Sequence, residues 1–207
     1  MYMLSIITTV KKRYKSFVYF VDVVSKIKYD YELCVSIFDE KKDYENFLNF
    51  KKINYKIITS NEKFSISKGK NLSYSISKGN IIFFVDCDVI WNDFFIKKII
   101  SNNQKNSIRF PLIYRWLTEI YPWEDKLKKR GKWADQCYGT VIGNKEDFEL
   151  LKNDFNFVGP WNENYTKWGW EDVDLFSRCS YKKINILREK EEIFHLWHPM
   201  HKDLLFL

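Results

Sequence analysis

The chain has 207 residues, of which 45% are hydrophobic and 18% aromatic, and its formal net charge is +7. This length suits one domain and this apolar content suffices for a packed core, which excludes a largely disordered chain. The lysines are scattered among acidic residues without a recognisable nucleic-acid-binding motif, so no nucleic-acid partner is expected. The charge indicates either a solvated surface or attraction to an anion, such as a nucleotide diphosphate or an anionic membrane.

The first half of the chain alternates between strand and helix patterns. Strands are predicted at residues 3–10, 31–38, 54–59 and 81–86, and helices at 14–27, 42–53, 67–79 and 92–102. Strands separated by helices predict βαβ units and a parallel sheet. The continuous apolar run of residues 81–85 predicts a central strand that is covered on both faces.

The second half is less regular. Strands are predicted at residues 107–116, 137–143, 184–189 and 192–197, and helices at 145–153 and 171–183. Residues 115–135 are aromatic and charged without a clear period, and six of the eight tryptophans lie between residues 116 and 170. We therefore expect an α/β fold whose sheet becomes mixed in this half, with a binding cleft near the tryptophans.

Two carboxylates follow the predicted central strand, at Asp86 and Asp88. Ligands of open α/β sheets bind beyond the carboxyl ends of the strands, and residues i and i+2 of a strand share one side. Two carboxylates so placed repel each other unless a cation joins them, and Mg²⁺ or Mn²⁺ completed by substrate phosphates is the usual solution. The alternative is an ordinary turn, because aspartate often ends a strand.

The three histidines of the chain all lie in the segment HLWHPMH, at positions 195, 198 and 201. Pro199 disfavours helix at His198, and a strand that ends in a turn here could bring His195 and His198 to one ion. Asp88 with one or both imidazoles would favour Mn²⁺ over Mg²⁺, because nitrogen ligands suit softer ions. The alternative is a tail with surface histidines that bind nothing.

A third motif is KWGWEDVDLFSRC, residues 167–179. Glu171, Asp172 and Asp174 lie in the first turn of the predicted helix, where the helix dipole favours acids, and Asp174 can pair with Arg178 four residues later. This structural explanation leaves out the tryptophans on either side of Gly169. An exposed tryptophan beside carboxylates suits a sugar, because the ring faces C–H groups and the acids accept from hydroxyls.

The three motifs in this order resemble glycosyltransferases of the GT-A fold. The first half is similar to family-two glycosyltransferases. The second half is similar to the C-terminal part of the β-1,4-galactosyltransferases and of the bacterial chondroitin and N-acetylgalactosaminyl transferases. The resemblance implies one GT-A domain over residues 1–207, with a central, mostly parallel sheet flanked by helices. Residues 1–100 would form its nucleotide-sugar-binding half, and residues 101–207 its acceptor-binding and catalytic half.

The resemblance also implies roles for individual residues. Asp39 alone fits the pair of acids that usually reads uracil and ribose, and Lys70 and Asn71 replace the usual Arg-Asn. The donor-binding residues would be Thr9, Val10, Arg13, Asp39, Lys70, Asn71, Asp86 and Asp88, and the metal ligands would be Asp88, His195 and His198.

On the acceptor side, Asp172 takes the place of the catalytic base. The acceptor-binding residues would be Trp168, Gly169, Trp170, Glu171 and Asp174. Trp170 replaces the second glycine that is common in the motif, which would narrow the sugar pocket.

The expected function is inverting, metal-dependent transfer of a galactose-type hexose or N-acetylhexosamine from a UDP-sugar to a hydroxyl of a surface glycan or lipid-linked saccharide, with Mn²⁺ or Mg²⁺ as cofactor. The alternatives are a nucleotidyltransferase or metal phosphohydrolase on a similar sheet, and a non-catalytic sugar-binding module. The chain shows no signal peptide pattern, no membrane-spanning run and no closely spaced cysteines. We expect a bacterial cytoplasmic enzyme of polysaccharide biosynthesis, with at most peripheral contact at the inner face of the membrane.

Overall fold

The structure, a computed structural model, describes residues 3–116, 131–134, 139–154, 156–166 and 169–198. Its large sheet has seven strands in the order β10-β6-β9-β4-β1-β2-β3. These strands are β1 (Leu4–Val10), β2 (Tyr31–Ile37), β3 (Tyr55–Thr59), β4 (Ile81–Phe84), β6 (Ser107–Arg109), β9 (Val141–Asn144) and β10 (Asn185–Leu187). Most neighbours are parallel, but β9 runs antiparallel to both β4 and β6. The prediction of a mostly parallel, mixed sheet is confirmed.

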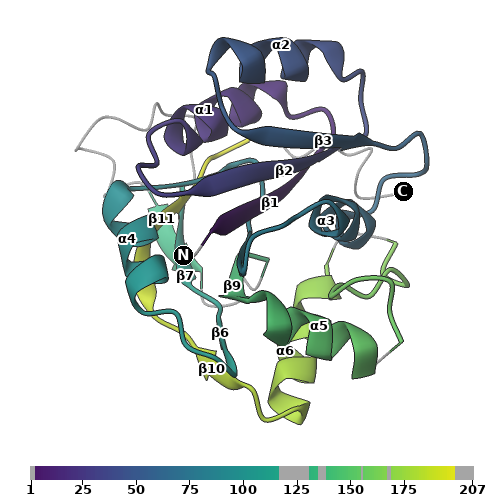
Figure 1. Cartoon of the computed structure of the whole chain (residues 1–207), viewed down its shortest axis with the longest axis vertical. Coiled ribbons are helices and arrows are strands. Elements are labelled where there is room, and N and C mark those ends of the chain that lie inside the picture. Colours follow the sequence, from purple (N-terminus) through teal and green to yellow (C-terminus); the bar gives the residue numbers. More distant parts are fainter. Residues whose placement is uncertain (1–2, 117–130, 135–138, 155, 167–168, 199–207) are drawn as a thin grey trace.

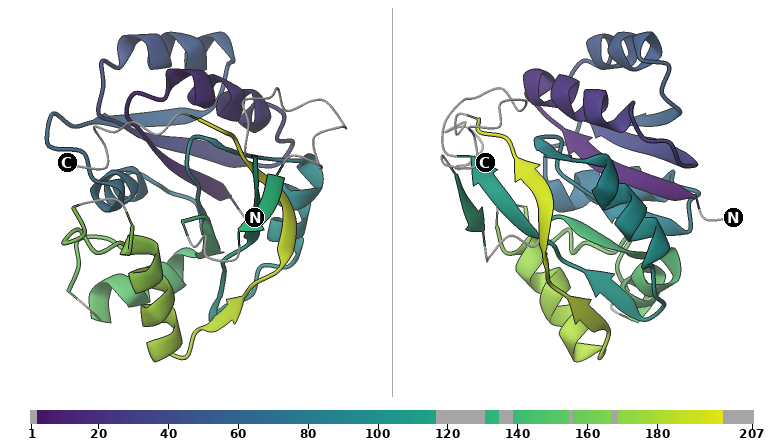
Figure 2. Two further views of the ribbon diagram at one scale, coloured as in Figure 1. Left: turned by 180° about the vertical axis from the view of Figure 1, so that it is seen from behind. Right: turned by 90° about the vertical axis from the view of Figure 1, so that its left-hand side faces the viewer.

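A second sheet of four strands lies beside the first, in the order β5-β11-β7-β8. Its strands are β5 (Val89–Trp91), β7 (Leu112–Trp116), β8 (Gly131–Ala134) and β11 (Lys190–His195). The prediction of a single strand at residues 107–116 is wrong. The strand is interrupted at Phe110 and Pro111, so that β6 before them belongs to the large sheet and β7 after them belongs to the small sheet. Proline has no amide hydrogen for a strand ladder, which explains a break at this position. The right-hand view of Figure 2 shows β11 beside β7.

The helices divide between the two faces of the large sheet (Figure 1). One face carries α1 (Tyr14–Val24), α2 (Lys42–Phe50) and α4 (Asp93–Ser101), and the other carries α3 (Ile66–Ser75), α5 (Lys145–Asp154) and α6 (Glu171–Tyr181). Ser65 caps α3 and Asn92 caps α4, each accepting a backbone amide hydrogen bond of the first turn. None of the helices in the described part of the chain has the length and apolar character that a membrane span requires.

The central strand β4 sends its side chains into two separate cores. Phe83 packs on one face against Trp91, with ring centroids 5.0 Å apart, and Phe84 packs on the other against Trp161, at 5.5 Å. Because both faces are covered, the prediction of a buried central strand is confirmed. Each such aromatic, fully buried, contributes about 1.5–3 kcal/mol to folding.

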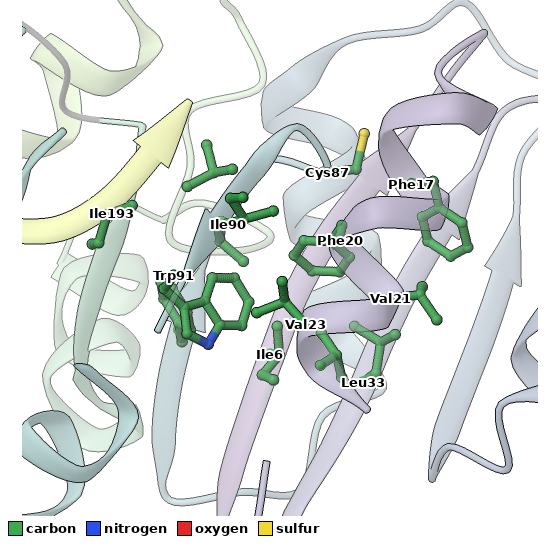
Figure 3. Close-up of a cluster of buried hydrophobic side chains, with 14 of the residues drawn as sticks. Ile6, Phe17, Phe20, Val21, Val23, Leu33, Cys87, Ile90, Trp91 and Ile193 are labelled. Atoms are coloured by element: carbon green, nitrogen blue, oxygen red, sulfur yellow. The ribbon is translucent and has the colours of Figure 1, made fainter. Parts of the chain in front are cut away.

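The core on the α1 side reaches the turn after β4. In Figure 3, Phe17 and Phe20 of α1 lie near Cys87, and Ile90 and Trp91 of β5 lie against the same cluster. Burial raises the pKa of the Cys87 thiol well above its usual value, so this residue is a small core side chain and not a reactive thiolate. The two aspartates on either side of it are thereby held on a rigid support.

Candidate active site

The two aspartates lie in a turn that connects the two sheets. Asp86 follows the end of β4, and the amide of Val89, the first residue of β5, donates to the Asp86 carbonyl at 3.0 Å. β11 pairs antiparallel with β5, and the amide of Leu196 donates to the Asp88 carbonyl at 2.7 Å. The small sheet therefore connects the segment that carries His195 and His198 directly to the turn formed by Asp86, Cys87 and Asp88, which we call the DCD turn.

This pairing brings Asp88, His195 and His198 together as the sequence predicted. His198 Nε2 lies 3.1 Å from Asp88 Oδ2, and His195 Nε2 lies 3.7 Å from Asp88 Oδ1. One ligand atom from each of the three residues can be chosen so that all lie within 4.8 Å of one another. Two imidazole nitrogens and one carboxylate are a donor set for a divalent transition-metal ion.

The surroundings of Asp88 also fit a cation. Its side chain is buried, with 7% of the residue exposed, and its Oδ1 has no hydrogen-bond partner among the described residues. Burial by itself would raise the pKa of Asp88, but His195, His198 and Arg13 outweigh it and lower this pKa well below its usual value. A buried carboxylate oxygen without a partner is rare and indicates a missing ligand, which a metal ion would supply.

Asp86 faces different partners. Its Oδ1 lies 3.0 Å from the ammonium of Lys70, a side chain that is only 1% exposed. The same ammonium donates to the Gly139 carbonyl at 2.8 Å and lies 4.4 Å from the centre of the Trp161 ring. A cation buried this deeply is stable only because a carboxylate, a carbonyl and an aromatic face surround it.

Gly69 explains how Lys70 reaches this position. A Cβ atom at Gly69 would lie 2.1 Å from Thr9 Oγ1, so only glycine lets α3 pack this closely on β1. The next residue of the helix then projects toward the end of β4. Gly139 is restricted in a milder way, because a Cβ there would meet Asp86 Oδ2 at 3.3 Å.

The acids of the third motif begin α6, as predicted. Glu171 is buried, with 6% exposed, and its Oε2 has no hydrogen-bond partner among the described residues. Burial raises the pKa of Glu171, the charges of Asp172 and Asp86 add to this rise, and the charge of Lys70 opposes it. Glu171 therefore lies close enough to the DCD turn to respond to Asp86 and Lys70.

The other two acids of α6 have their own partners. Asp172 is partly buried, and its Oδ1 accepts a hydrogen bond from the amide of Val173 at 2.9 Å. The predicted pair of Asp174 and Arg178 is confirmed, with Nε of Arg178 2.8 Å from Asp174 Oδ2. Arg178 also donates to the carbonyl of Pro160 at 2.8 Å, so Asp174 helps to hold α6 against the preceding loop.

The residues expected near the nucleotide lie at the carboxyl ends of β1 and β2. The side chain of Val10 is fully buried in the core, and its carbonyl accepts from the amide of Phe38. Val10 therefore supports the loop from the core, whereas Arg13, which precedes α1, is close enough to Asp88 to lower its pKa. Thr9 is buried, with its hydroxyl 3.5 Å from the carbonyl of Ser36.

Two further predicted donor residues are engaged within the protein. Asp39 accepts hydrogen bonds from the amide of Lys12 and from the hydroxyl of Tyr44. Asn71 donates to the Trp161 carbonyl at 2.8 Å and accepts from the Trp161 amide at 3.0 Å. These contacts give Asp39 and Asn71 roles in shaping the loops around the site.

Sequence reasoning missed Trp161 and Gly139 as partners of Lys70. Trp161 belongs to the tryptophan-rich region, but nothing in its local pattern indicates a lysine 91 positions earlier. The predicted acceptor residue Trp168 and the third histidine, His201, lie outside the described residues, whereas Gly169 and Trp170 immediately precede α6.

The sequence of this chain is similar to glycosyltransferases in the region that carries the α6 acids and the histidines. Residues 126–202 match the family model described as the N-terminal domain of galactosyltransferase, a range that contains the α6 acids and both histidines. The chain is 25% identical to human chondroitin sulfate synthase 3 over 174 residues, covering 78% of this chain and 19% of that protein. It is 25% identical to mouse chondroitin sulfate N-acetylgalactosaminyltransferase 1, covering 72% and 30%. The chain thus spans less than a third of these relatives.

Among solved structures, residues 1–349 of TarS from S. aureus superimpose with a TM-score of 0.68 at 15% identity, covering 95% of this chain and 60% of that one. The same TarS segment solved with UDP gives a TM-score of 0.65 at 15% identity, covering 95% and 61%. A 4-diphosphocytidyl-2C-methyl-D-erythritol synthase from Anaerococcus prevotii gives 0.63 at 11% identity, covering 99% and 93%. At these identities the structures establish the fold alone.

The fold, the ordered motifs and these relatives define the class of protein. The chain has the GT-A fold, and its sequence is similar to glycosyltransferases, in agreement with the resemblance seen in its three motifs. Its relatives are of the galactosyltransferase and chondroitin-synthase type.

Proposed function

We propose that this protein is an inverting, metal-dependent glycosyltransferase that moves a galactose-type hexose or N-acetylhexosamine from a UDP-sugar to a sugar hydroxyl. The observation that carries the proposal is the meeting of Asp88, His195 and His198 at the turn where Asp86 contacts Lys70. Support for the donor comes from the UDP in the TarS structure and from the N-acetylgalactosaminyl group in the relatives' names.

Asp88, His195 and His198 would hold the metal, and Mn²⁺ fits their mixed nitrogen and oxygen donors better than Mg²⁺ does. When bound, the ion would neutralise negative charge on the departing diphosphate and orient the donor. Lys70 already compensates the charge of Asp86. Asp86 can therefore accept a hydrogen bond from a ribose hydroxyl without adding a second uncompensated negative charge to the site.

In the transfer itself, the acceptor hydroxyl oxygen attacks the anomeric carbon of the donor. The bond from that carbon to the diphosphate oxygen breaks, and the electron pair leaves with the nucleoside diphosphate. Asp172 takes the hydroxyl proton as general base, and a single in-line displacement inverts the anomeric centre. Glu171 would orient the acceptor from its neighbouring position on α6.

The wider assignments rest on the same resemblance. Residues 1–100 would bind the nucleotide sugar, and residues 101–207 would bind the acceptor and supply the base. The acceptor would be a surface glycan or a lipid-linked saccharide reached by peripheral contact at the inner face of a bacterial membrane, where lysines are attracted to anionic lipids.

The test is a screen of nucleotide sugars with Mn²⁺, which reads donor hydrolysis and sugar transfer to a glycoside panel by mass spectrometry. We expect UDP-galactose or a UDP-N-acetylhexosamine to be used and the new linkage to have the opposite anomeric configuration. Failure to use any nucleotide sugar, with or without added metal, would contradict the proposal.

A nucleotidyltransferase is the second candidate, because the fold also superimposes on the diphosphocytidyl synthase over nearly its whole length. That reaction would release pyrophosphate from a nucleoside triphosphate. It gives no function to the acids of α6 beside an exposed Trp170. Incubation with CTP or UTP and a sugar phosphate, followed by a pyrophosphate assay, distinguishes the two activities. Binding of glycosides without any turnover would instead indicate a sugar-binding module.

A further inference from the structure

Trp170 has a backbone conformation that a tryptophan rarely adopts. Its φ is 76° and its ψ is −23°, in the left-handed region, directly after Gly169 with φ 94°. Six non-glycine residues of the described chain have positive φ, and Trp170 is the only aromatic one among them. The others are lysines and asparagines, residues whose unbranched or short side chains suffer less there.

The fold requires this conformation at the start of α6. The Trp170 carbonyl accepts a hydrogen bond from the amide of Asp174 at 2.8 Å, and this bond begins the helix. Glycine would serve here without strain, whereas a left-handed residue with a side chain is disfavoured by about 1–2 kcal/mol. A tryptophan at this position therefore needs a reason other than the turn.

Packing does not supply that reason, because 71% of Trp170 is exposed. The space beside it is open, since a Cβ atom at Gly169 would meet no atom within 4 Å. A large apolar ring on an open surface gains little for folding and is a suitable contact for an apolar face of a ligand.

A second observation concerns the next residue of the chain. Glu171 follows Trp170, is more than nine-tenths buried, and has an oxygen without a hydrogen-bond partner among the described residues. A hydroxyl group that reached this oxygen would satisfy it. An apolar ring beside a carboxylate that lacks a donor matches the chemistry of a sugar, which has C–H groups on one face and hydroxyls at its edge.

We propose that Trp170 is a stacking platform for the pyranose ring of the acceptor, held in a strained conformation that a glycine would relieve, and that it selects acceptors with an apolar C–H face next to the reacting hydroxyl. This inference deepens the proposed function and rests on it for the identity of the reaction. It assigns Trp170 to specificity and not to the chemical step.

The experiment compares Trp170→Gly and Trp170→Phe with two matched controls. Lys183→Gly removes a side chain from another left-handed residue, with φ 55°, just after α6, and Tyr181→Ala removes an exposed aromatic from the far end of the same helix. Each protein is measured for melting temperature, for UDP-sugar hydrolysis without acceptor, and for transfer to the methyl β-glycosides of galactose, glucose and mannose. Saturation-transfer NMR with the same glycosides reports binding without turnover.

We expect Trp170→Gly to melt no lower than wild type and to hydrolyse the donor at the wild-type rate. Its KM for the glycoside acceptor should rise by about tenfold, a loss typical of one aromatic contact. Its saturation-transfer signal on the ring C–H protons should fall, and Trp170→Phe should lie between it and wild type. The two controls should leave acceptor KM unchanged.

A lower melting temperature of Trp170→Gly would give Trp170 a structural role and overturn the platform, as would an unchanged acceptor KM. Loss of donor hydrolysis at an unchanged melting temperature would place Trp170 on the donor, which also overturns it. If the wild-type protein uses no UDP-sugar, the proposed function fails. Glycoside binding that depends on Trp170 would then still support the platform, and binding that does not would overturn it.

Discussion

Asp86 and Asp88 are two residues apart in one turn, yet their carboxylates have different partners. Asp86 lies against Lys70, a cation that the protein itself supplies from α3. Asp88 lies against His195 and His198, which can carry positive charge only by protonation, and its Oδ1 has no hydrogen-bond partner in the described chain. The first carboxylate is paired with a cation of the protein itself, whereas the second belongs to the proposed metal site.

The difference teaches how two acids that are two residues apart can share one turn, because each carboxylate faces its own set of neighbours. Cys87 is buried in the core between them, and the aspartates face separate sets of neighbours. The sequence pattern suggests repulsion between the two carboxylates. Lys70 offsets it at Asp86, and the two histidines face the charge of Asp88. Substitutions can test each of these contacts separately.

The largest expected effect comes from removing the proposed metal ligands. Asp88→Asn or His198→Ala should lower kcat/KM for transfer by at least about a hundredfold, because the loss of a ligand weakens both metal binding and charge stabilisation. Titration of Mn²⁺ by electron paramagnetic resonance should show weaker binding in both variants. Lys105→Ala, which removes an exposed ion pair with Glu146, is the control. Unchanged metal dependence in either variant would refute the ligand assignment.

Asp172→Asn should come next. The amide cannot accept the proton from the acceptor, so transfer should fall by about 10²–10⁴-fold, while UDP-sugar binding measured by calorimetry stays near that of wild type. Asp174→Asn serves for comparison, because it breaks the ion pair with Arg178 and should lower stability more than it lowers turnover. Turnover of Asp172→Asn at the wild-type rate would remove this residue as the base.

Removing the internal cation should affect stability more than metal binding. Lys70→Met leaves Asp86 and the Gly139 carbonyl without their donor and should lower the free energy of unfolding by about 1–3 kcal/mol, as measured with urea. Asp86→Asn should lower it less, because Asp86 is partly exposed and its amide can still accept from Lys70. Mn²⁺ affinity should change little in both variants. A large loss of affinity would mean that the contact between Lys70 and Asp86 is part of the proposed metal site.

The smallest effect concerns Glu171 and pH. Burial raises its pKa in the folded protein, so the folded state binds this proton more tightly than the unfolded state does. The associated stability is present below the unfolded-state pKa and is lost as pH rises through the folded-state pKa. At neutral pH, the free energy of unfolding of Glu171→Gln should therefore be about 1 kcal/mol higher than that of wild type. Near pH 4 the two proteins should have the same free energy of unfolding. Urea unfolding at both pH values measures this, and equal differences at both would contradict it.

Periodic patterns predicted most of the large sheet and, to within a few residues, the six helices of the described part of the chain. The run IIFFV is apolar on both sides, and only a strand between two cores has that environment, so β4 could be identified as central. β5 and β8 were not predicted, since three or four residues are too few to establish a period. The break at Pro111 was missed because the residues on both sides favour strand.

The candidate site was predicted where its chemistry is local in sequence and missed where it is not. Two aspartates around a cysteine, or two histidines three apart, show their residue types directly. The contact between Lys70 and Trp161 depends on how α3 packs on β1 at Gly69, and this is a property of the folded chain alone. The engagement of Asn71 by the Trp161 backbone is hidden for the same reason.

The backbone contact between Leu196 and the Asp88 carbonyl has a consequence for folding during synthesis. The DCD turn is made early by the ribosome, but the strand that carries the histidines emerges about a hundred residues later. A nascent chain up to α6 therefore cannot assemble the three-ligand set, however well its large sheet has formed. If these residues bind Mn²⁺ as proposed, tight binding would thus report that β11 has joined the small sheet.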